Sequence, residues 1–206
     1  EDFTSCAQHL RILFPFKNTA TTSDNKEQQF PPLCAKSHSA GGVLVCGSIN
    51  HEASQTNVFQ GVTLTSPYIN VYETMRDTSL PLTEYEWEEW GNPSNYSSAI
   101  TNSPINNGVS SSGLSMHNIV KSYCPMQNIN TKGGVVNFPK MLLFGAIDDD
   151  VVQYWHSAGY VDKVRDIIRK EQQQKRDNTN CDASAGEEKM VLFIEEEGGH
   201  TLEANK

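Results

Sequence analysis

Short apolar stretches alternate with amphipathic ones along the chain. The apolar runs have the length of strands and are predicted to be buried strands at 33–36, 61–65, 141–147 and 190–194. Apolar residues at helical spacing predict helices over 2–14, 43–53 and 156–170. Strands that alternate with helices favour a parallel sheet covered by helices on both faces. We therefore expect an α/β fold.

Three polar stretches interrupt this pattern. They lie near 17–30, 94–115 and 171–188, and they are rich in Asn, Ser, Gln and Thr. Segments of this composition cannot bury enough apolar surface to form a core of their own. The whole chain, 1–206, is thus predicted to be one domain or part of one, with three loop insertions.

Charge and cysteine content narrow the range of partners. The chain has 25 acidic and 16 basic residues and a net charge of -9. This balance disfavours nucleic acid, because phosphate binding needs clustered Lys and Arg. Acidic domains are common, so the charge by itself indicates little more than solubility.

The five cysteines are odd in number and contain no CxxC pair. A disulfide framework or a zinc site is therefore not expected, and a reducing, cytoplasmic location is the simplest prediction. No apolar run approaches the roughly 18 residues that a membrane span requires. We expect neither a membrane nor a nucleic acid as a partner.

Three candidate catalytic residues each follow a predicted strand. Ser39 follows the first strand, Asp149 the third and His200 the fourth. Parallel strands joined by right-handed crossovers end at one edge of their sheet, where function gathers. We therefore expect these three side chains to meet.

Ser39 lies in the sequence SHSAGG. A G-x-S-x-G elbow needs small residues two places on either side of the serine, because strand and helix backbones come close there. Gly41 fulfils this need, and Ser37 replaces the first glycine with another small residue. The backbone N–H of Ala40 would then be an oxyanion donor. The alternative is an ordinary Ser/Gly-rich loop.

Asp149 and His200 complete the pattern. Asp149 lies in GAIDDDVV, where an aspartate can hold a histidine tautomer, but where acids also favour a helix N-terminus. His200 lies on a glycine-flanked loop and is suited to general base catalysis, although one of six histidines can simply be exposed. The order Ser, Asp, His is that of α/β-hydrolases.

An acidic, aromatic segment, EYEWEEW, spans 84–90. A carboxylate near a cleft would bind a guanidinium, and the aromatic faces would add cation–π attraction. The alternative is a solvated acidic turn anchored by tryptophans.

Several long segments of the sequence resemble the corresponding segments of oligopeptidases of the B type, in the prolyl oligopeptidase family of serine peptidases. They are DFTSCAQHL, SAGG, SPYINVYETM, TSLPLTEYEWEEWGNP, HNIVKSYCPMQNI and DDDVVQYWHSAGYVDKVR. The resemblance implies an α/β-hydrolase catalytic domain that cleaves short peptides after Arg or Lys, without a metal or organic cofactor. It also implies Ser39 as nucleophile, Asp149 as triad acid, His200 as base, and Glu86 and Glu88 as the acidic pair for the basic side chain.

The resemblance further implies segments that lie outside these 206 residues. The family has a propeller and an eight-stranded sheet, and four strands are predicted here. We expect this chain to be the C-terminal part of the hydrolase domain, with the propeller and early strands as missing partners.

Some positions depart from the family pattern. Ser37 and His38 replace glycines, and Val151 replaces an arginine that helps to hold substrate in prolyl oligopeptidase. These changes leave a second hypothesis open, a catalytically impaired relative that binds basic peptides or a partner protein. A third is a peptidase that prefers proline.

Overall fold

The structure is a computed structural model that describes residues 2–14, 32–52, 58–95, 115–129, 138–179, 190–195 and 198–200. Its strands are β1 (Cys34–His38), β2 (Gly61–Thr65), β3 (Lys140–Ala146) and β4 (Met190–Glu195). Its helices are α1 (Asp2–Leu13), α2 (Gly41–Glu52), α3 (Val71–Thr74), α4 (Trp87–Trp90), α5 (Met116–Tyr123), the 3-10 helix η1 (Pro125–Gln127) and α6 (Trp155–Thr179).

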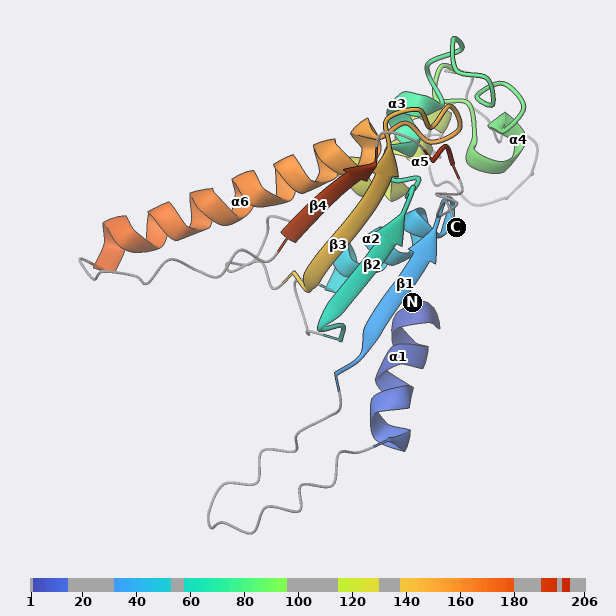
Figure 1. Cartoon of the computed structure of the whole chain (residues 1–206). Coiled ribbons are helices and arrows are strands. Elements are labelled where there is room, and N and C mark those ends of the chain that lie inside the picture. Colours follow the sequence, from blue (N-terminus) through green and yellow to red (C-terminus); the bar gives the residue numbers. More distant parts are fainter. Residues whose placement is uncertain are drawn as a thin grey trace, which may run out of the picture.

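The four described strands form one parallel sheet in the order β1-β2-β3-β4. One row of paired residues crosses it, from Ala35 through Val62 and Met141 to Met190. All four strands therefore end at the same edge, as Figure 1 shows. The prediction of a parallel α/β sheet is confirmed.

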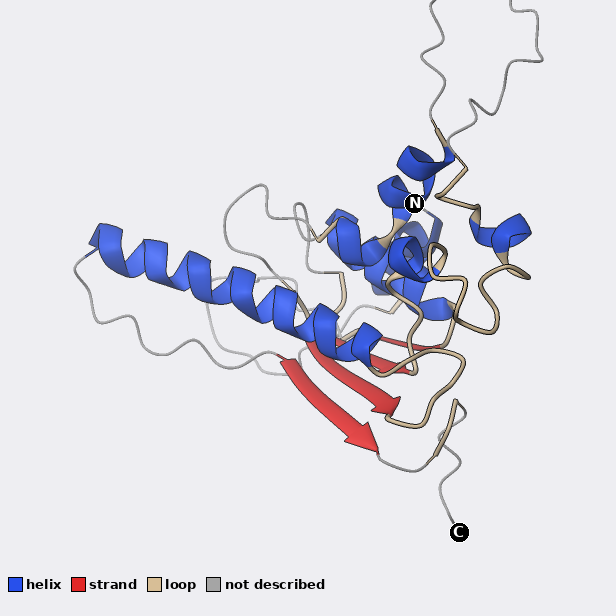
Figure 2. Cartoon of the chain, turned by 90° about the horizontal axis from the view of Figure 1, so that it is seen from above, coloured by secondary structure: helices blue, strands red, loops and turns tan. Residues whose placement is uncertain are grey.

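The helices that connect neighbouring strands lie on one side of the sheet in the described residues (Figure 2). Each strand adds next to its predecessor in the same direction. Right-handed crossovers then place every connection on the same face. The sequence pattern led us to expect helices on both faces, and this part of the chain supplies the cover of one.

The core follows from the alternation of side chains along the strands. Val62 and Leu64 of β2 are buried, as are Met141 and Leu143 of β3, while Thr63 and Leu142 between them are only partly buried. Successive side chains point to opposite faces of a sheet, so these four share one face. Burying each contributes about 1.5–3 kcal/mol. The helical residues of the same cluster include Val45, Cys46, Ile49, Tyr160, Val161 and Val164.

The helices between β2 and β3, namely α3, α4 and α5, lie beyond the carboxyl ends of the strands (Figure 1). The Trp87 indole N–H donates to the carbonyl of Met75 over 3.0 Å. The Tyr123 hydroxyl donates to the carbonyl of Trp90. These two bonds fix the acidic, aromatic segment over the edge where the candidate site was expected.

Helix α6 is longer than the sequence pattern predicted. We expected a helix that ends at Lys170 and a polar insertion over 171–188, but α6 continues to Thr179. Residues 171–176 read EQQQKR, types with high helix propensity that need no apolar stripe when a helix projects beyond the core. Gln173 also donates to Asp177 over 2.9 Å, one turn further on.

The other predicted insertions fall largely outside the described residues. Residues 17–30 are not described, and neither are 96–114 and 180–189. Ser115, the last residue of the second insertion, is the N-cap of α5, where its side chain accepts the N–H of Asn118.

The described residues contain free cysteine thiols and no helix suited to cross a membrane. Four cysteines lie in the described part of the chain (Cys6, Cys34, Cys46 and Cys124), and all four are free thiols. Cys181 lies outside it. None of the described helices combines the length and apolar character needed to cross a membrane.

Candidate active site

Ser39 stands on a sharp turn between β1 and α2. Its backbone φ is 51°, in the left-handed region that residues other than glycine rarely adopt. Ser39 N–H donates to the carbonyl of Thr65, and the Ser39 carbonyl accepts the N–H groups of Gly42 and Tyr68. These bonds hold the strained turn, which presents the hydroxyl above the sheet edge.

The two glycines after Ala40 are required by close packing. A Cβ at Gly41 would come within 3.0 Å of the Ser37 Cβ, and one at Gly42 within 2.8 Å of the Pro67 Cβ. Ser37 fits the position two residues before the serine because it, too, is small. No described group accepts a hydrogen bond from Ala40 N–H, and Ala40 is one of the residues that line the cavity beside Ser39.

Asp149 is held at the end of β3 by backbone bonds. Its Oδ1 accepts the N–H of Val151 over 3.0 Å and that of Val152 over 2.8 Å. The side chain is 0% exposed. This burial differs from the alternative that the sequence left open for Asp149, in which the acid only lines a helix N-terminus.

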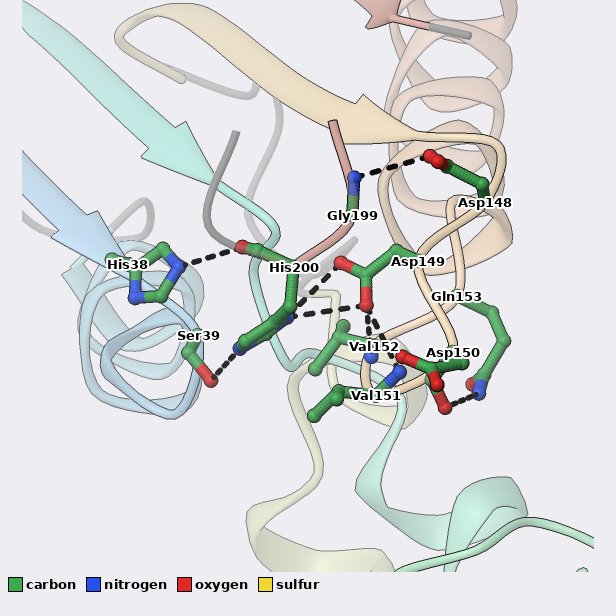
Figure 3. A network of polar contacts seen from close by, with 10 residues as sticks. All are labelled: His38, Ser39, Asp148, Asp149, Asp150, Val151, Val152, Gln153, Gly199 and His200. Carbon is green, nitrogen blue, oxygen red and sulfur yellow. Dashed lines mark hydrogen bonds and ion pairs between the residues drawn. The ribbon is translucent and has the colours of Figure 1, made fainter. Parts of the chain in front are cut away.

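His200 joins the other two residues (Figure 3). Its Nδ1 lies 3.0 Å from Asp149 Oδ2, and its Nε2 lies 2.9 Å from Ser39 Oγ. A carboxylate beside Nδ1 keeps the proton on that nitrogen, so Nε2 is free to accept the serine proton. The structure brings together all three residues that the sequence singled out.

Two further residues hold the His200 loop. The carboxylate of Asp148 accepts the N–H groups of Gly198 and Gly199 over 3.4 and 3.2 Å. His38 Nε2 lies 3.0 Å from the His200 carbonyl, and the two imidazole rings are 4.9 Å apart. Sequence reasoning treated His38 only as a replacement of glycine. Its place directly before Ser39 was the one signal that pointed to the site.

A cavity opens beside Ser39 and carries negative charge. Its walls are partly apolar, and the carboxylates that line it are those of Glu86 and Glu89. Glu88, which was expected to pair with Glu86, is exposed and does not line the cavity. The other lining residues are Ala40, Tyr68, Thr74, Met75, Leu80, Leu82, Thr83, Trp90, Val151 and Val152.

Burial raises the pKa of the Glu86 carboxyl. A hydrogen bond from Trp90 opposes this shift, and the nearby charge of Glu89 adds to it. A partly desolvated carboxylate attracts a cation more strongly than one in water. The cavity is therefore suited to a basic side chain.

His156 contacts Thr74 and Tyr68, which line this cavity, and was missed by the sequence analysis. It is 0% exposed, and its Nδ1 accepts the N–H groups of Ile69 and Asn70 over 3.2 and 3.1 Å. Nε2 therefore carries the proton and donates to Thr74 Oγ1 over 3.1 Å. Burial lowers the pKa of His156 to about 3, against the opposing effect of Asp149. No periodicity in the sequence distinguishes it from the other histidines.

Among the described residues, no group of three or more His, Cys, Asp or Glu side chains is placed to hold a metal ion. Nucleophilic chemistry by Ser39 is what the arrangement favours.

Known proteins show the same combination of sequence and fold. A sequence model of the prolyl oligopeptidase family matches residues 32–200. The prolyl endopeptidase-like protein of Xenopus laevis is 34% identical over 169 residues, which are 82% of this chain and 19% of that protein. Protease 2 of Moraxella lacunata is 30% identical over 166 residues, or 81% of this chain and 19% of that protein. The chain thus spans about a fifth of the length of these relatives.

A solved structure agrees with the fold. Oligopeptidase B from Trypanosoma brucei, with covalently bound antipain, superposes with a TM-score of 0.62 at 26% identity. The match covers 97% of this chain and 21% of that one. The expected fold, part of an α/β-hydrolase domain, and the expected family resemblance are both confirmed.

Proposed function

Because this chain belongs to the prolyl oligopeptidase family, we propose that it carries the active site of a serine peptidase with Ser39, Asp149 and His200 as its triad. The observation that carries the proposal is His200, whose two ring nitrogens lie within 3.0 Å of Asp149 and Ser39. Bridging of this kind is how a base is oriented and made ready to accept a serine proton.

The reaction starts with attack of Ser39 Oγ on the peptide carbonyl carbon, while His200 Nε2 takes the hydroxyl proton. The oxyanion that forms is stabilised by Ala40 N–H. His200 then gives its proton to the leaving amine, and an acyl-enzyme remains. Water, deprotonated by His200 Nε2, attacks the ester carbonyl carbon. His200 then gives this proton to Ser39 Oγ as the acyl–oxygen bond breaks, which releases the acid and restores Ser39.

The substrates that we propose are short peptides with Arg or Lys before the scissile bond, the P1 position. Support comes from the carboxylates of Glu86 and Glu89 in the cavity beside Ser39. Glu88 stays a prediction of the family resemblance as the partner of Glu86. Gln variants of the three glutamates distinguish these assignments, as argued in the Discussion.

The complete enzyme, we propose, includes an upstream propeller and the early strands of the hydrolase sheet. In the described sheet, β1 pairs with β2 alone, which leaves its other edge open to a further strand. The α1 segment also exposes Leu10, Ile12, Leu13 and Phe14. Co-expression with the upstream region should raise solubility and activity, and no gain in either would count against this arrangement.

A second candidate function is that of an impaired relative that binds basic peptides or a partner protein. It is favoured by Val151, which places no cation in the cavity wall where prolyl oligopeptidase has an arginine. The two candidates share a fold and differ in the reactivity of Ser39.

Labelling with a fluorophosphonate separates the two candidates. The reagent should form a stable adduct with the full-length protein but not with its Ser39→Ala variant, because only an activated serine attacks phosphorus at a useful rate. Mass spectrometry of tryptic peptides locates the adduct. A folded protein that takes no label would favour the binding function.

A further inference from the structure

We propose that the hydroxyl of Tyr68 is a specificity-determining group that accepts a hydrogen bond from the P1 guanidinium and so favours Arg over Lys. The inference rests on the proposed peptidase function and names a residue that the family resemblance did not assign.

The first observation is an unpaired polar atom in a buried place. Tyr68 is 5% exposed and lines the cavity beside Ser39. Its hydroxyl makes no hydrogen bond of ordinary geometry within the described residues. Thr74 Oγ1 accepts from His156 Nε2 over 3.1 Å, and the Thr74 hydroxyl is also a neighbour that lowers the pKa of Tyr68, which marks it as a loose donor to the Tyr68 oxygen. A hydroxyl oxygen has two lone pairs, so this contact leaves one acceptor position for a ligand. Buried hydroxyls without a full set of partners are costly, and a ligand bound in the cavity that Tyr68 lines can supply the missing one.

The second observation is that the ring cannot easily turn away from the cavity. Its centroid lies 5.4 Å from that of Trp90 and 5.5 Å from that of His156, so both rings restrict its movement. The Tyr68 N–H donates to the Ser39 carbonyl over 2.8 Å. The backbone of Tyr68 is thus bonded to that of the nucleophile. This bond fixes how far from Ser39 a P1 head group would meet the Tyr68 hydroxyl.

The third observation concerns charge. Burial, and then the negative charge of Glu86, raise the pKa of Tyr68, so its hydroxyl stays neutral at any physiological pH. Tyr68 and Glu86 line the same cavity, so both can act on one ligand. Together they offer a carboxylate and a neutral oxygen to a single cation.

The geometry of the head group then decides between the two basic side chains. A guanidinium has five N–H donors, and a carboxylate accepts two of them in a bidentate pair. In a buried cavity the remaining donors need acceptors of their own, and the Tyr68 oxygen is one. An ammonium has three donors that can rotate, and is satisfied more readily without it.

The test compares the full-length protein with its Tyr68→Phe variant, which keeps the ring and loses only the hydroxyl. Fluorogenic peptides that differ only at P1 would carry Arg, Lys or the neutral norleucine. We expect kcat/KM to fall about tenfold for the Arg peptide, less than about threefold for Lys and not at all for norleucine.

A matched control is Tyr72→Phe, four residues further along the same segment. The Tyr72 hydroxyl contacts His117 over 3.2 Å and does not line the cavity. In this variant the ratio of kcat/KM for the Arg peptide to that for the norleucine peptide should equal that of the unmodified protein. An equal loss on all three peptides in Tyr68→Phe, or no loss on any, would overturn the inference.

A binding measurement keeps the inference testable if no peptide is cleaved. In the Ser39→Ala background, Tyr68→Phe should weaken binding of the Arg peptide several-fold more than that of the Lys peptide, by calorimetry. Absence of cleavage together with this loss would defeat the peptidase function alone. Cleavage by the unmodified protein with unchanged Arg preference in Tyr68→Phe would defeat the Tyr68 inference alone.

Discussion

His38 Nε2 lies 3.0 Å from the carbonyl oxygen of His200, so the residue just before the candidate nucleophile holds the loop of the candidate base. A carbonyl can only accept, which means that the imidazole donates. His38 is itself exposed and stands where the family pattern has glycine. A replacement that looked unfavourable in the sequence therefore provides a hydrogen bond to the backbone of His200.

The first prediction follows from this bond. His38→Ala should lower kcat/KM by about two- to tenfold, because a neutral hydrogen bond contributes about 0.5–1.5 kcal/mol. The loss should lie in kcat rather than KM, since His38 does not line the P1 cavity. Its rate of fluorophosphonate labelling should fall in parallel. A labelling rate equal to that of the unmodified protein would show that the contact does not position His200.

Asp149→Asn should lower kcat by about 10⁴, a magnitude known for the same change in chymotrypsin-like triads. An amide in place of the carboxylate no longer keeps the proton on His200 Nδ1. The amide oxygen can still accept the N–H groups of Val151 and Val152, so the fold should persist. Steady-state kinetics and circular dichroism check the two halves of this prediction. A kcat within tenfold of the original would remove Asp149 from the triad.

The glutamates of the cavity should differ in importance. Glu86→Gln should lower kcat/KM for Arg peptides by 10- to 100-fold and leave norleucine peptides unaffected, because a partly buried charge pair is lost. Glu89→Gln should have a smaller effect of the same kind. Glu88→Gln is the matched control in this structure, whereas the family resemblance assigns it an effect like that of Glu86. A large loss in Glu88→Gln with none in Glu89→Gln would favour the resemblance.

The pH dependence of Arg cleavage has a defined sign. The pKa of Glu86 is raised by burial, so this carboxylate becomes neutral at a higher pH than an ordinary glutamate as the solution is acidified. The ratio of kcat/KM for Arg to that for norleucine should therefore fall with decreasing pH, starting above the usual titration range of glutamate. This change with pH should be much smaller in Glu86→Gln. A ratio independent of pH in the unmodified protein would contradict the role of Glu86.

His156 should couple stability to pH. Its pKa is lowered to about 3 by burial, whereas in the unfolded chain it is about 6.5. Between these values the unfolded chain binds the extra proton, so His156 makes stability fall by about 1.4 kcal/mol per pH unit as pH drops below about 6.5. Urea unfolding of the unmodified protein and of His156→Gln measures this as a difference in slope between pH 6 and 4. Parallel slopes would contradict it.

The sequence predicted those features that depend on local pattern and chain order. Four apolar runs became four parallel strands, and Ser39, Asp149 and His200 meet because each follows a strand of that sheet. The extension of α6 was missed because 171–179 lacks an apolar stripe. His156 and the Tyr68 hydroxyl matter only through tertiary neighbours, and the choice between Glu88 and Glu89 depends on how Trp87 anchors a short helix. None of these leaves a periodic signal.

The most direct test is hydrolysis of fluorogenic peptides with Arg, Lys or Pro at P1 by the full-length protein beside its Ser39→Ala variant. We predict cleavage after Arg and Lys, little after Pro, and none in the variant. Cleavage after Pro alone would leave the triad in place and remove the basic specificity. No cleavage of any peptide by the well-folded protein would contradict the account that Ser39, Asp149 and His200 form a working peptidase site.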